Sequence, residues 1–288
     1  MMDHRLELFI KAAEKGSFTS VAEELYISQP AVSKAINSLE KELNIRLFYR
    51  DRRNGLSLTE AGERILILAR QTADIDQRIY QESYRVNHRM GGKLRIGSLP
   101  ILTTTMLSRI IPEYRKKYPD VSLEIHEGSP RGLKNALNRH EIDVALSCSP
   151  FDEFDHEVLV HDQMVGIYAS NLIDPPKQID LYEGKPDLIA VRAAVETISE
   201  SLRSAARPDF SNYMLLEDYI TVIRMVEHGN GVGIISKYTL DSVQHNLKTC
   251  ELIPEILIDI GVEAIDLNDL TPAAEAFVAL LKDLSFVT

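Results

Sequence analysis

A stretch of about thirty residues, from Thr59 to the glycine pair at 91 and 92, contains no proline and is typical of one long helix. At 1.5 Å per residue this helix would be about 45 Å long, more than a small neighbouring domain can cover. The alternative is that the helix packs only on its own domain. Its length instead favours a seam covered by a second copy of the chain, so we predict a dimerisation helix over 59–90. Positions with a four-three repeat form that seam, at Ala61, Ile65, Leu68, Thr72, Ile75, Ile79, Glu82 and Val86.

The predicted helix separates two parts of different charge. The whole chain has 32 Lys and Arg against 43 Asp and Glu, a net charge of -11, which by itself argues against a polyanionic partner. Residues 1–90, however, hold 14 basic and 13 acidic side chains, whereas residues 91–288 hold 18 and 30. Such clustering is either a solvated face or a contact surface for phosphates, and charge alone does not decide. The clustered residues are Lys34, Lys41, Arg46, Arg50, Arg52, Arg53, Arg64 and Arg70.

Composition narrows the class of protein. The 288 residues, 44% of them apolar, suffice for two or three folded domains. No apolar run approaches the length of a membrane-spanning helix, and the acidic residues Asp3 and Glu7 do not fit an export signal. Two widely separated cysteines, Cys148 and Cys250, fit a reducing compartment. We therefore expect a cytoplasmic protein without a membrane partner.

The first fifty residues predict a helix-turn-helix. One amphipathic helix ends at Gly16, Ser17 caps a second, and Ser28 caps a third that has Pro30 in its first turn. The third helix carries an apolar stripe opposite a short polar and cationic face. Side chains of this kind hydrogen-bond base edges and phosphates when a helix lies in a major groove. The candidates for DNA contact are Ser28, Gln29, Pro30, Ser33, Lys34 and Asn37.

A hairpin is predicted next, because Asn54-Gly55 favours a tight turn and Leu56 and Leu58 alternate with a polar residue. Its tip carries Arg50, Arg52 and Arg53. A surface hairpin with solvated arginines is an equally simple interpretation. The neighbouring helix-turn-helix favours a wing that contacts flanking phosphates or the minor groove.

Beyond residue 91 the pattern alternates between strands and helices, which predicts parallel α/β units. Ligands of such sheets bind where strands end and helices begin, and small hydroxyl side chains lie at three of these places. They are Ser98, Thr103, Thr104, Ser129 and Ser147. With the amides of helix N-termini, they would suit a small carboxylate or phosphate. Hydroxyls near strand ends are also common caps, and the residues alone favour that structural role.

Taken in order, several segments resemble the N-terminal signature of LysR-type transcriptional regulators. They are Leu8-Phe9, Gly16-Ser17-Phe18, Ala22-Glu23-Glu24-Leu25, Ser28-Gln29-Pro30-Ala31-Val32-Ser33, Leu39-Glu40, Leu47-Phe48 and Leu58-Thr59-Glu60-Ala61-Gly62. Two departures are Lys34, where many members carry Arg, and Asn44, where the family usually has Gly. The lysine replaces a bidentate guanine reader with a point charge, which makes a phosphate contact the expected role.

The resemblance implies an α/β fold with three parts: a winged helix-turn-helix over 1–58, a linker helix over 59–90, and an effector-binding domain over 91–288. That domain would consist of two α/β subdomains similar to periplasmic binding proteins, the first over about 91–160 plus 267–288 and the second over about 161–266. It also implies a homodimer that assembles into a homotetramer on double-stranded DNA with an interrupted palindrome, and RNA polymerase as a further partner.

The same resemblance implies a small-molecule effector between the two subdomains, and it places the five hydroxyl residues ahead of their structural role. Arg192, Thr197 and Thr221 are the candidates from the second subdomain. The alternative function is a cytoplasmic small-molecule binding protein or enzyme whose helix-turn-helix serves only as an interaction module.

No catalytic, cofactor or metal motif stands out. Gly229-Asn230-Gly231-Val232-Gly233 falls one step short of a dinucleotide-binding pattern, because Ile234 takes the last glycine position. The histidines have no metal-binding spacing, and Cys148 has no closely spaced resolving cysteine for a redox switch. We therefore expect a protein that is not an enzyme and that holds no cofactor or metal.

Overall fold

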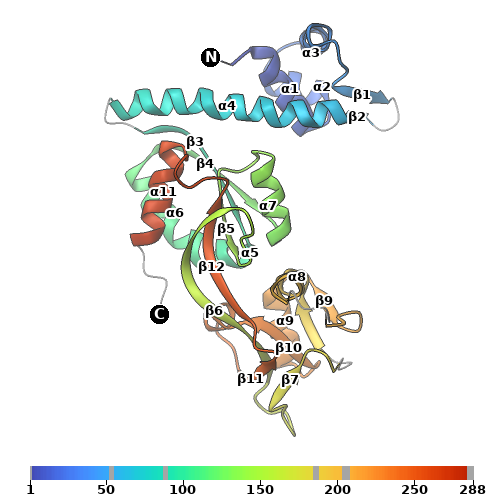
Figure 1. Cartoon of the computed structure of the whole chain (residues 1–288), viewed down its shortest axis with the longest axis vertical. Coiled ribbons are helices and arrows are strands. Elements are labelled where there is room, and N and C mark those ends of the chain that lie inside the picture. The colour runs from blue at the N-terminus through green and yellow to red at the C-terminus, as the bar shows by residue number, and fades with distance from the viewer. Residues whose placement is uncertain (1, 52–54, 87–89, 184–187, 203–207, 284–288) are drawn as a thin grey trace.

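The structure is a computed structural model that describes residues 2–51, 55–86, 90–183, 188–202 and 208–283. Figure 1 shows a helical head at the top, one long helix across the molecule beneath it, and an α/β body of two lobes below. The expected fold class is confirmed. In the described part of the chain, no helix is both long and apolar enough to cross a membrane.

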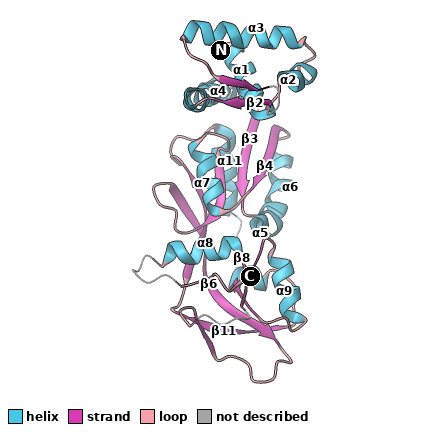
Figure 2. Ribbon diagram, turned by 90° about the vertical axis from the view of Figure 1, so that its right-hand side faces the viewer, coloured by secondary structure: helices cyan, strands magenta, loops and turns pink. Residues whose placement is uncertain are grey.

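The head forms around the predicted caps and turns. Ser17 and Ser28 accept hydrogen bonds from Ser20 N (3.3 Å) and Ala31 N (3.4 Å), which start the second and third helices. Residues buried from all three helices, and from α4, make one small core. The elements are α1 (His4–Lys15), α2 (Phe18–Glu24), α3 (Gln29–Leu43) and the hairpin β1 (Phe48–Asp51) and β2 (Gly55–Leu58). Both views place α3 on the outside of the head, away from the lobes (Figures 1 and 2).

Helix α4 (Glu60–Val86) joins the head to the first lobe. Its first turns pack in the head core, while its second half lies on the first lobe. Gln81 is fully buried there, and its Oε1 accepts a hydrogen bond from Ala273 N at 3.2 Å. Arg78 adds an ion pair with Asp269 at 2.6 Å. Amide and ionic side chains therefore fix this helix to the lobe, and most of the predicted seam is left exposed.

The first lobe contains three parallel strands in the order β4-β3-β5, with helices on the faces of the sheet, and the strand Leu257–Ala264 continues the sheet antiparallel to β5. The first helical stretch of this lobe consists of three consecutive segments from Pro100 to Lys117, with a π-helical turn in the middle. The elements are β3 (Gly91–Ser98), α5 (Pro100–Leu102), η1 (Thr103–Leu107), α6 (Ser108–Lys117), β4 (Asp120–Glu127), α7 (Pro130–Asn138), β5 (Val144–Cys148) and α11 (Pro272–Asp283).

Two antiparallel strands, β6 (Asp155–Ala169) and β12 (Leu257–Ala264), run between the lobes and pair with each other. β12 contributes Ile258 to the second core and Ile260 and Val262 to the first. The subdomain limits given above therefore stay a proposal. The second lobe contains β7 (Gln178–Asp180), β8 (Leu188–Val191), α8 (Arg192–Ser201), β9 (Met214–Leu216), α9 (Tyr219–Glu227), β10 (Val232–Ser236), α10 (Lys237–Asp241) and β11 (Leu247–Ile253).

Candidate nucleic-acid interface and ligand cleft

The outer face of α3 presents the residues predicted to contact DNA. Gln29, Pro30, Lys34 and Asn37 are exposed and Ser33 is half-buried, whereas the opposite face is anchored by buried Val32, Ile36 and Leu39. Their spacing places these polar side chains on one side of the helix. An amide, a hydroxyl and an ammonium group in this arrangement can hydrogen-bond base edges and phosphates. Ser28 is exposed as well, but its oxygen also serves as the N-cap.

Lys34 and Lys41 on α3 differ from the cations of α1. Arg5 pairs with Asp3 and Glu42, and both Lys11 and Lys15 pair with Glu24. Within the described ranges, no acidic side chain forms an ion pair with Lys34 or Lys41. These two ammonium groups are therefore available to a phosphate without loss of an internal pair.

The predicted hairpin is present, with Arg50 opposite Leu56 in antiparallel register. Arg52 and Arg53 lie outside the described residues, and of Arg50 only the backbone is described. The role of these three arginines in a wing stays a prediction.

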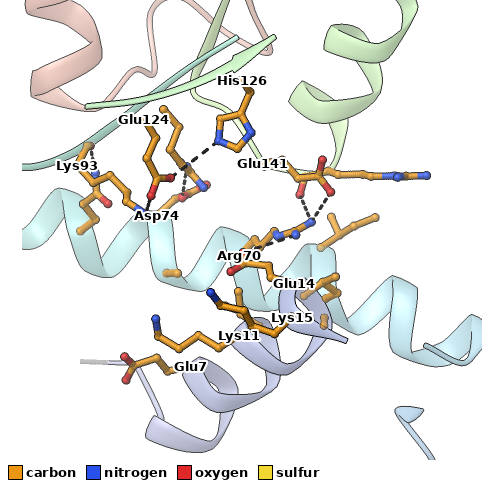
Figure 3. A pocket seen from close by; sticks show the side chains of 18 of the residues that line it. Glu7, Lys11, Glu14, Lys15, Arg70, Asp74, Lys93, Glu124, His126 and Glu141 are labelled. Carbon is orange, nitrogen blue, oxygen red and sulfur yellow. Dashed lines mark hydrogen bonds and ion pairs between the residues drawn. The ribbon is translucent and has the colours of Figure 1, made fainter. Parts of the chain in front are cut away.

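A wide cavity of about 1180 Å³ lies between α1, α4 and the β3–β4 edge, not at the predicted ligand cleft (Figure 3). Arg70 bonds Glu141 at 2.9 Å and lies 3.8 Å from Glu14. Asp74 pairs with Arg95 at 2.7 Å, and Lys93 pairs with Glu124 at 2.5 Å. Since these charged walls are already paired within the chain, we interpret the cavity as a polar gap between head and first lobe.

Ser98 and Ser129 lie close together at the carboxyl edge of the first-lobe sheet, whereas Ser147 follows Leu146, the register partner of Ser98, so its side chain points to the opposite face of the sheet. Ser98 is the last residue of β3, which lies between β4 and β5. Its carbonyl oxygen accepts a hydrogen bond from Gly128 N at 3.2 Å. Ser98 Oγ is buried and donates to Leu99 O at 3.0 Å. Ser129 Oγ caps α7 by accepting from Gly132 N at 3.2 Å. Both hydroxyls therefore also have the structural role that we weighed as the alternative.

Thr103 and Thr104 lie on the π-helical turn. Their Oγ1 atoms donate to the carbonyls of Leu99 at 3.5 Å and Pro100 at 3.2 Å. Because a hydroxyl has only one proton, these threonines can accept from a ligand but cannot donate to it in this conformation.

A small cavity of about 30 Å³ lies between the two lobes. Of the predicted effector residues only Thr197 lines it, and Thr197 Oγ1 is 3.4 Å from Cys148 Sγ across the lobe boundary. Burial raises the pKa of Cys148 to about 11, so this thiol is protonated at neutral pH. The lining residues are Leu99, Ile101, Leu102, Cys148, Met164, Ala194, Thr197, Tyr219, Ser236, Thr239, Ile258 and Ile260.

Arg192 and Thr221 do not line this cavity. Arg192 Nε pairs with Glu217 at 2.9 Å on the surface, and Thr221 Oγ1 donates to Asp218 at 2.7 Å. Tyr219, Ser236 and Thr239 also line this cavity and were not predicted from the sequence. Ser236 ends β10 and caps α10, so the strand-end rule that selected Ser98 would also have selected it.

Ser147 lies beside an unpartnered acid. Glu263 on β12 is fully buried, and neither its two oxygens nor Ser147 Oγ has a hydrogen-bond partner among the described residues, although the two side chains are neighbours. Burial raises the pKa of Glu263 from 4.5 to about 7, and the positive charge of Lys134 opposes the rise.

Glu263→Gln is expected to remove a loss of stability at high pH. The unfolded carboxyl releases its proton near pH 4.5 and the folded one near 7, so the free energy of unfolding should fall across this window by about 3 kcal/mol. Thermal unfolding at pH 5 and pH 8 measures this effect. The Tm advantage of the variant over wild type should grow by roughly 5 °C or more at pH 8.

Glu113→Gln, at an exposed position of α6, is the matched control because it removes no buried charge. Parallel Tm curves for wild type and Glu263→Gln between pH 5 and pH 8 would contradict the assignment of this pH dependence to Glu263.

Two protein-family models match the chain. Residues 4–63 match the bacterial regulatory helix-turn-helix protein, lysR family, and residues 87–285 match the LysR substrate binding domain. The uncharacterized HTH-type transcriptional regulator YoaU of Bacillus subtilis is 37% identical over 98% of this chain and 97% of the relative. YvbU, from the same organism and with the same description, is 29% identical over 97% of both chains.

Solved structures show the same fold. A full-length OxyR variant from Pseudomonas aeruginosa superposes with a TM-score of 0.70 at 19% identity, over 98% of this chain and 93% of that one. CbnR, a LysR family transcriptional regulator, gives a TM-score of 0.60 at 16% identity over 99% of both chains. CbnR complexed with its target DNA gives 0.59 at 17% identity, over 98% of this chain and 99% of that one.

Proposed function

The chain belongs to the LysR family of bacterial transcriptional regulators, and on this premise we propose a cytoplasmic dimer that reads an interrupted palindrome and responds to a small anionic metabolite. The observation that carries the proposal is the outer face of α3, where Gln29, Ser33 and Lys34 lie together on a helix anchored from behind. CbnR, which shares the fold, has a structure in complex with target DNA.

A second copy of the chain would cover the exposed seam of α4. Leu68, Ile75 and Ile79 are 56%, 58% and 60% exposed, which is unusual for three large apolar residues on one helix face. Thr72 and Glu82 continue the same exposed face, and Val86 lies beyond the side chains that the structure describes. Pairing along this seam would set the distance between two α3 helices and hence the half-site spacing.

The effector would bind between the lobes and change how they close on each other. A cavity of about 30 Å³ holds about one water, so a metabolite requires the lobes to open. The backbone amides at the N-terminus of α7, which Ser129 caps beside Ser98, favour an anionic ligand. We further propose that two dimers form a tetramer, that effector binding changes the spacing of its four heads, and that RNA polymerase senses the change.

Thr197→Val is expected to weaken effector binding about tenfold while DNA affinity stays unchanged. In the closed lobes Thr197 Oγ1 donates to Ala193 O at 3.0 Å, so the hydroxyl has to turn its proton to an anionic ligand when the lobes open, and valine keeps the shape of the cavity wall without that proton. A thermal-shift screen with small carboxylates and phosphates identifies the ligand first, since a ligand of the folded state raises Tm. Titration of the variant then measures the change.

Thr221→Val is the matched control, because Thr221 does not line the cavity. A screen in which no anionic metabolite raises Tm would contradict the proposed ligand class. Equal affinities of wild type and Thr197→Val would contradict the position of the site.

A further inference from the structure

The turn between α2 and α3 contains a tyrosine in an unusual backbone conformation. Tyr26 has φ 55°, in the left-handed region. Ile27 N donates to Ala22 O at 3.0 Å and Tyr26 N donates to Glu23 O at 3.3 Å, which is the paired hydrogen-bond pattern of a helix end that places one residue in this region. Glycine is the residue that usually occupies such a position.

Two other helices of the head end with residues that suit the left-handed region. α1 ends at Gly16 with φ 60°, and α3 ends at Asn44 with φ 53°. Glycine has no Cβ to clash, and asparagine tolerates the region better than most residues. Tyr26 is bulkier than both, so the backbone of this turn does not explain why a tyrosine is present.

Packing does not explain it either. The side chain of Tyr26 is 95% exposed. In the ranges that the structure describes, neither its ring nor its hydroxyl has a partner. A strained residue with no intramolecular contact suggests a role toward an external partner.

The position of Tyr26 indicates which partner. It lies two residues before Ser28, the N-cap of α3, and the exposed run continues through Ser28, Gln29 and Pro30 into the proposed DNA-reading face. In a helix-turn-helix the first helix crosses the DNA backbone before the second enters the major groove, so the turn between them lies close to the sugar-phosphate backbone. Tyrosine hydroxyls are among the groups that bind phosphate oxygens there.

We propose that Tyr26 is a DNA-positioning residue whose phenol hydroxyl donates a hydrogen bond to a phosphate at the edge of the major groove read by α3. The inference rests on the proposed function, because it requires the chain to bind DNA through α3. The phenol is uncharged, so this contact fixes the position of the helix and releases few counterions, unlike the contact expected of Lys34.

Tyr26→Phe and Tyr26→Gly test the proposal on a double-stranded fragment that the wild-type chain recovers from genomic DNA. Tyr26→Phe should lower affinity about tenfold with unchanged Tm, because only the hydroxyl is lost. Tyr26→Gly should lower affinity at least as much and yet raise Tm by roughly 2–4 °C, because it relieves the backbone. In both variants the salt dependence and the ratio of specific to non-specific binding should stay as in wild type.

Asn44→Gly is the matched control, since it makes the same change at the other end of α3, where we place no DNA contact; its affinity should equal that of wild type. Wild-type affinity in both Tyr26 variants would overturn the proposal while leaving α3 as the reading helix. A lower Tm for Tyr26→Gly would also overturn it, by showing that the tyrosine stabilises the head. A wild-type chain that recovers no DNA would overturn the proposed function, and this inference with it.

Discussion

Replacing Gln29 and Ser33 together with alanine is expected to lower affinity for the specific DNA site by at least about 30-fold. Each side chain that reads a base edge contributes about 1–3 kcal/mol of discrimination, so the loss of two removes at least about 2 kcal/mol. The fold should be unaffected, because both residues lie on the outer side of α3 and buried Val32, Ile36 and Leu39 hold the other side in the head core.

Fluorescence anisotropy on the specific fragment and on a scrambled fragment of equal length measures this effect. Affinity for the scrambled fragment should change little, since phosphate contacts carry non-specific binding. Ser38→Ala is the control, because Ser38 is exposed on the same helix but faces Arg5, with Arg5 Nη1 3.4 Å from Ser38 Oγ. Equal losses on both fragments would show that Gln29 and Ser33 contact the DNA backbone and do not read bases.

The head was predictable because its signals are local. Ser17 and Ser28 cap helices in the structure as their sequence context predicts, and the hairpin predicted from Asn54-Gly55 pairs Phe48 with Leu58. Capping and turn chemistry depend on residues only a few positions apart, so they are visible in a sequence. Tyr26 was not anticipated, because a tyrosine gives no local sign of a left-handed conformation.

The lobes were predictable only in part, because their connection depends on pairing between distant segments. Strands β6 and β12 pair residues about a hundred positions apart in the sequence. β12 also carries Glu263, which is buried in the structure although a glutamate in a sequence usually indicates a surface position. The proximity of Ser98 and Ser129 followed from the parallel-sheet rule, since β3 and β4 are neighbours, but the alternation of side chains along β5 turns Ser147 to the other face of the sheet. The residues of the second lobe that line the cleft could not be predicted in the same way, and of the three candidates there only Thr197 lines it.

Helix α4 was also predictable only in part. Its length and exposed repeat were visible in the sequence, whereas its attachment to the first lobe through buried Gln81 was not. A glutamine on a helix usually indicates a solvated position. Here its amide meets the N-terminus of α11, so polar side chains anchor the face turned toward the lobe, while large apolar side chains remain on the free face. That inversion is what leaves Leu68, Ile75 and Ile79 for a partner.

The double variant Ile75→Glu and Ile79→Glu is therefore expected to weaken dimerisation by at least about 100-fold. Each dimer would lose four isoleucine contacts and gain four carboxylates in or near an apolar seam, a change of more than about 3 kcal/mol. In a single chain the two side chains are 58% and 60% exposed, so the helix itself should remain folded. Sedimentation velocity gives the mass, and circular dichroism checks the helix content.

Ile173→Glu is the matched control, because Ile173 is 92% exposed in the second lobe and the same chemical change there should leave a dimer. Dimer loss should also reduce binding to a two-half-site fragment to the level of a single half-site, since each chain then binds alone with no shared geometry. A double variant that still sediments as a dimer would show that copies of the chain associate through another surface. In that case the exposed seam of α4 would bind a partner other than a second copy of the chain.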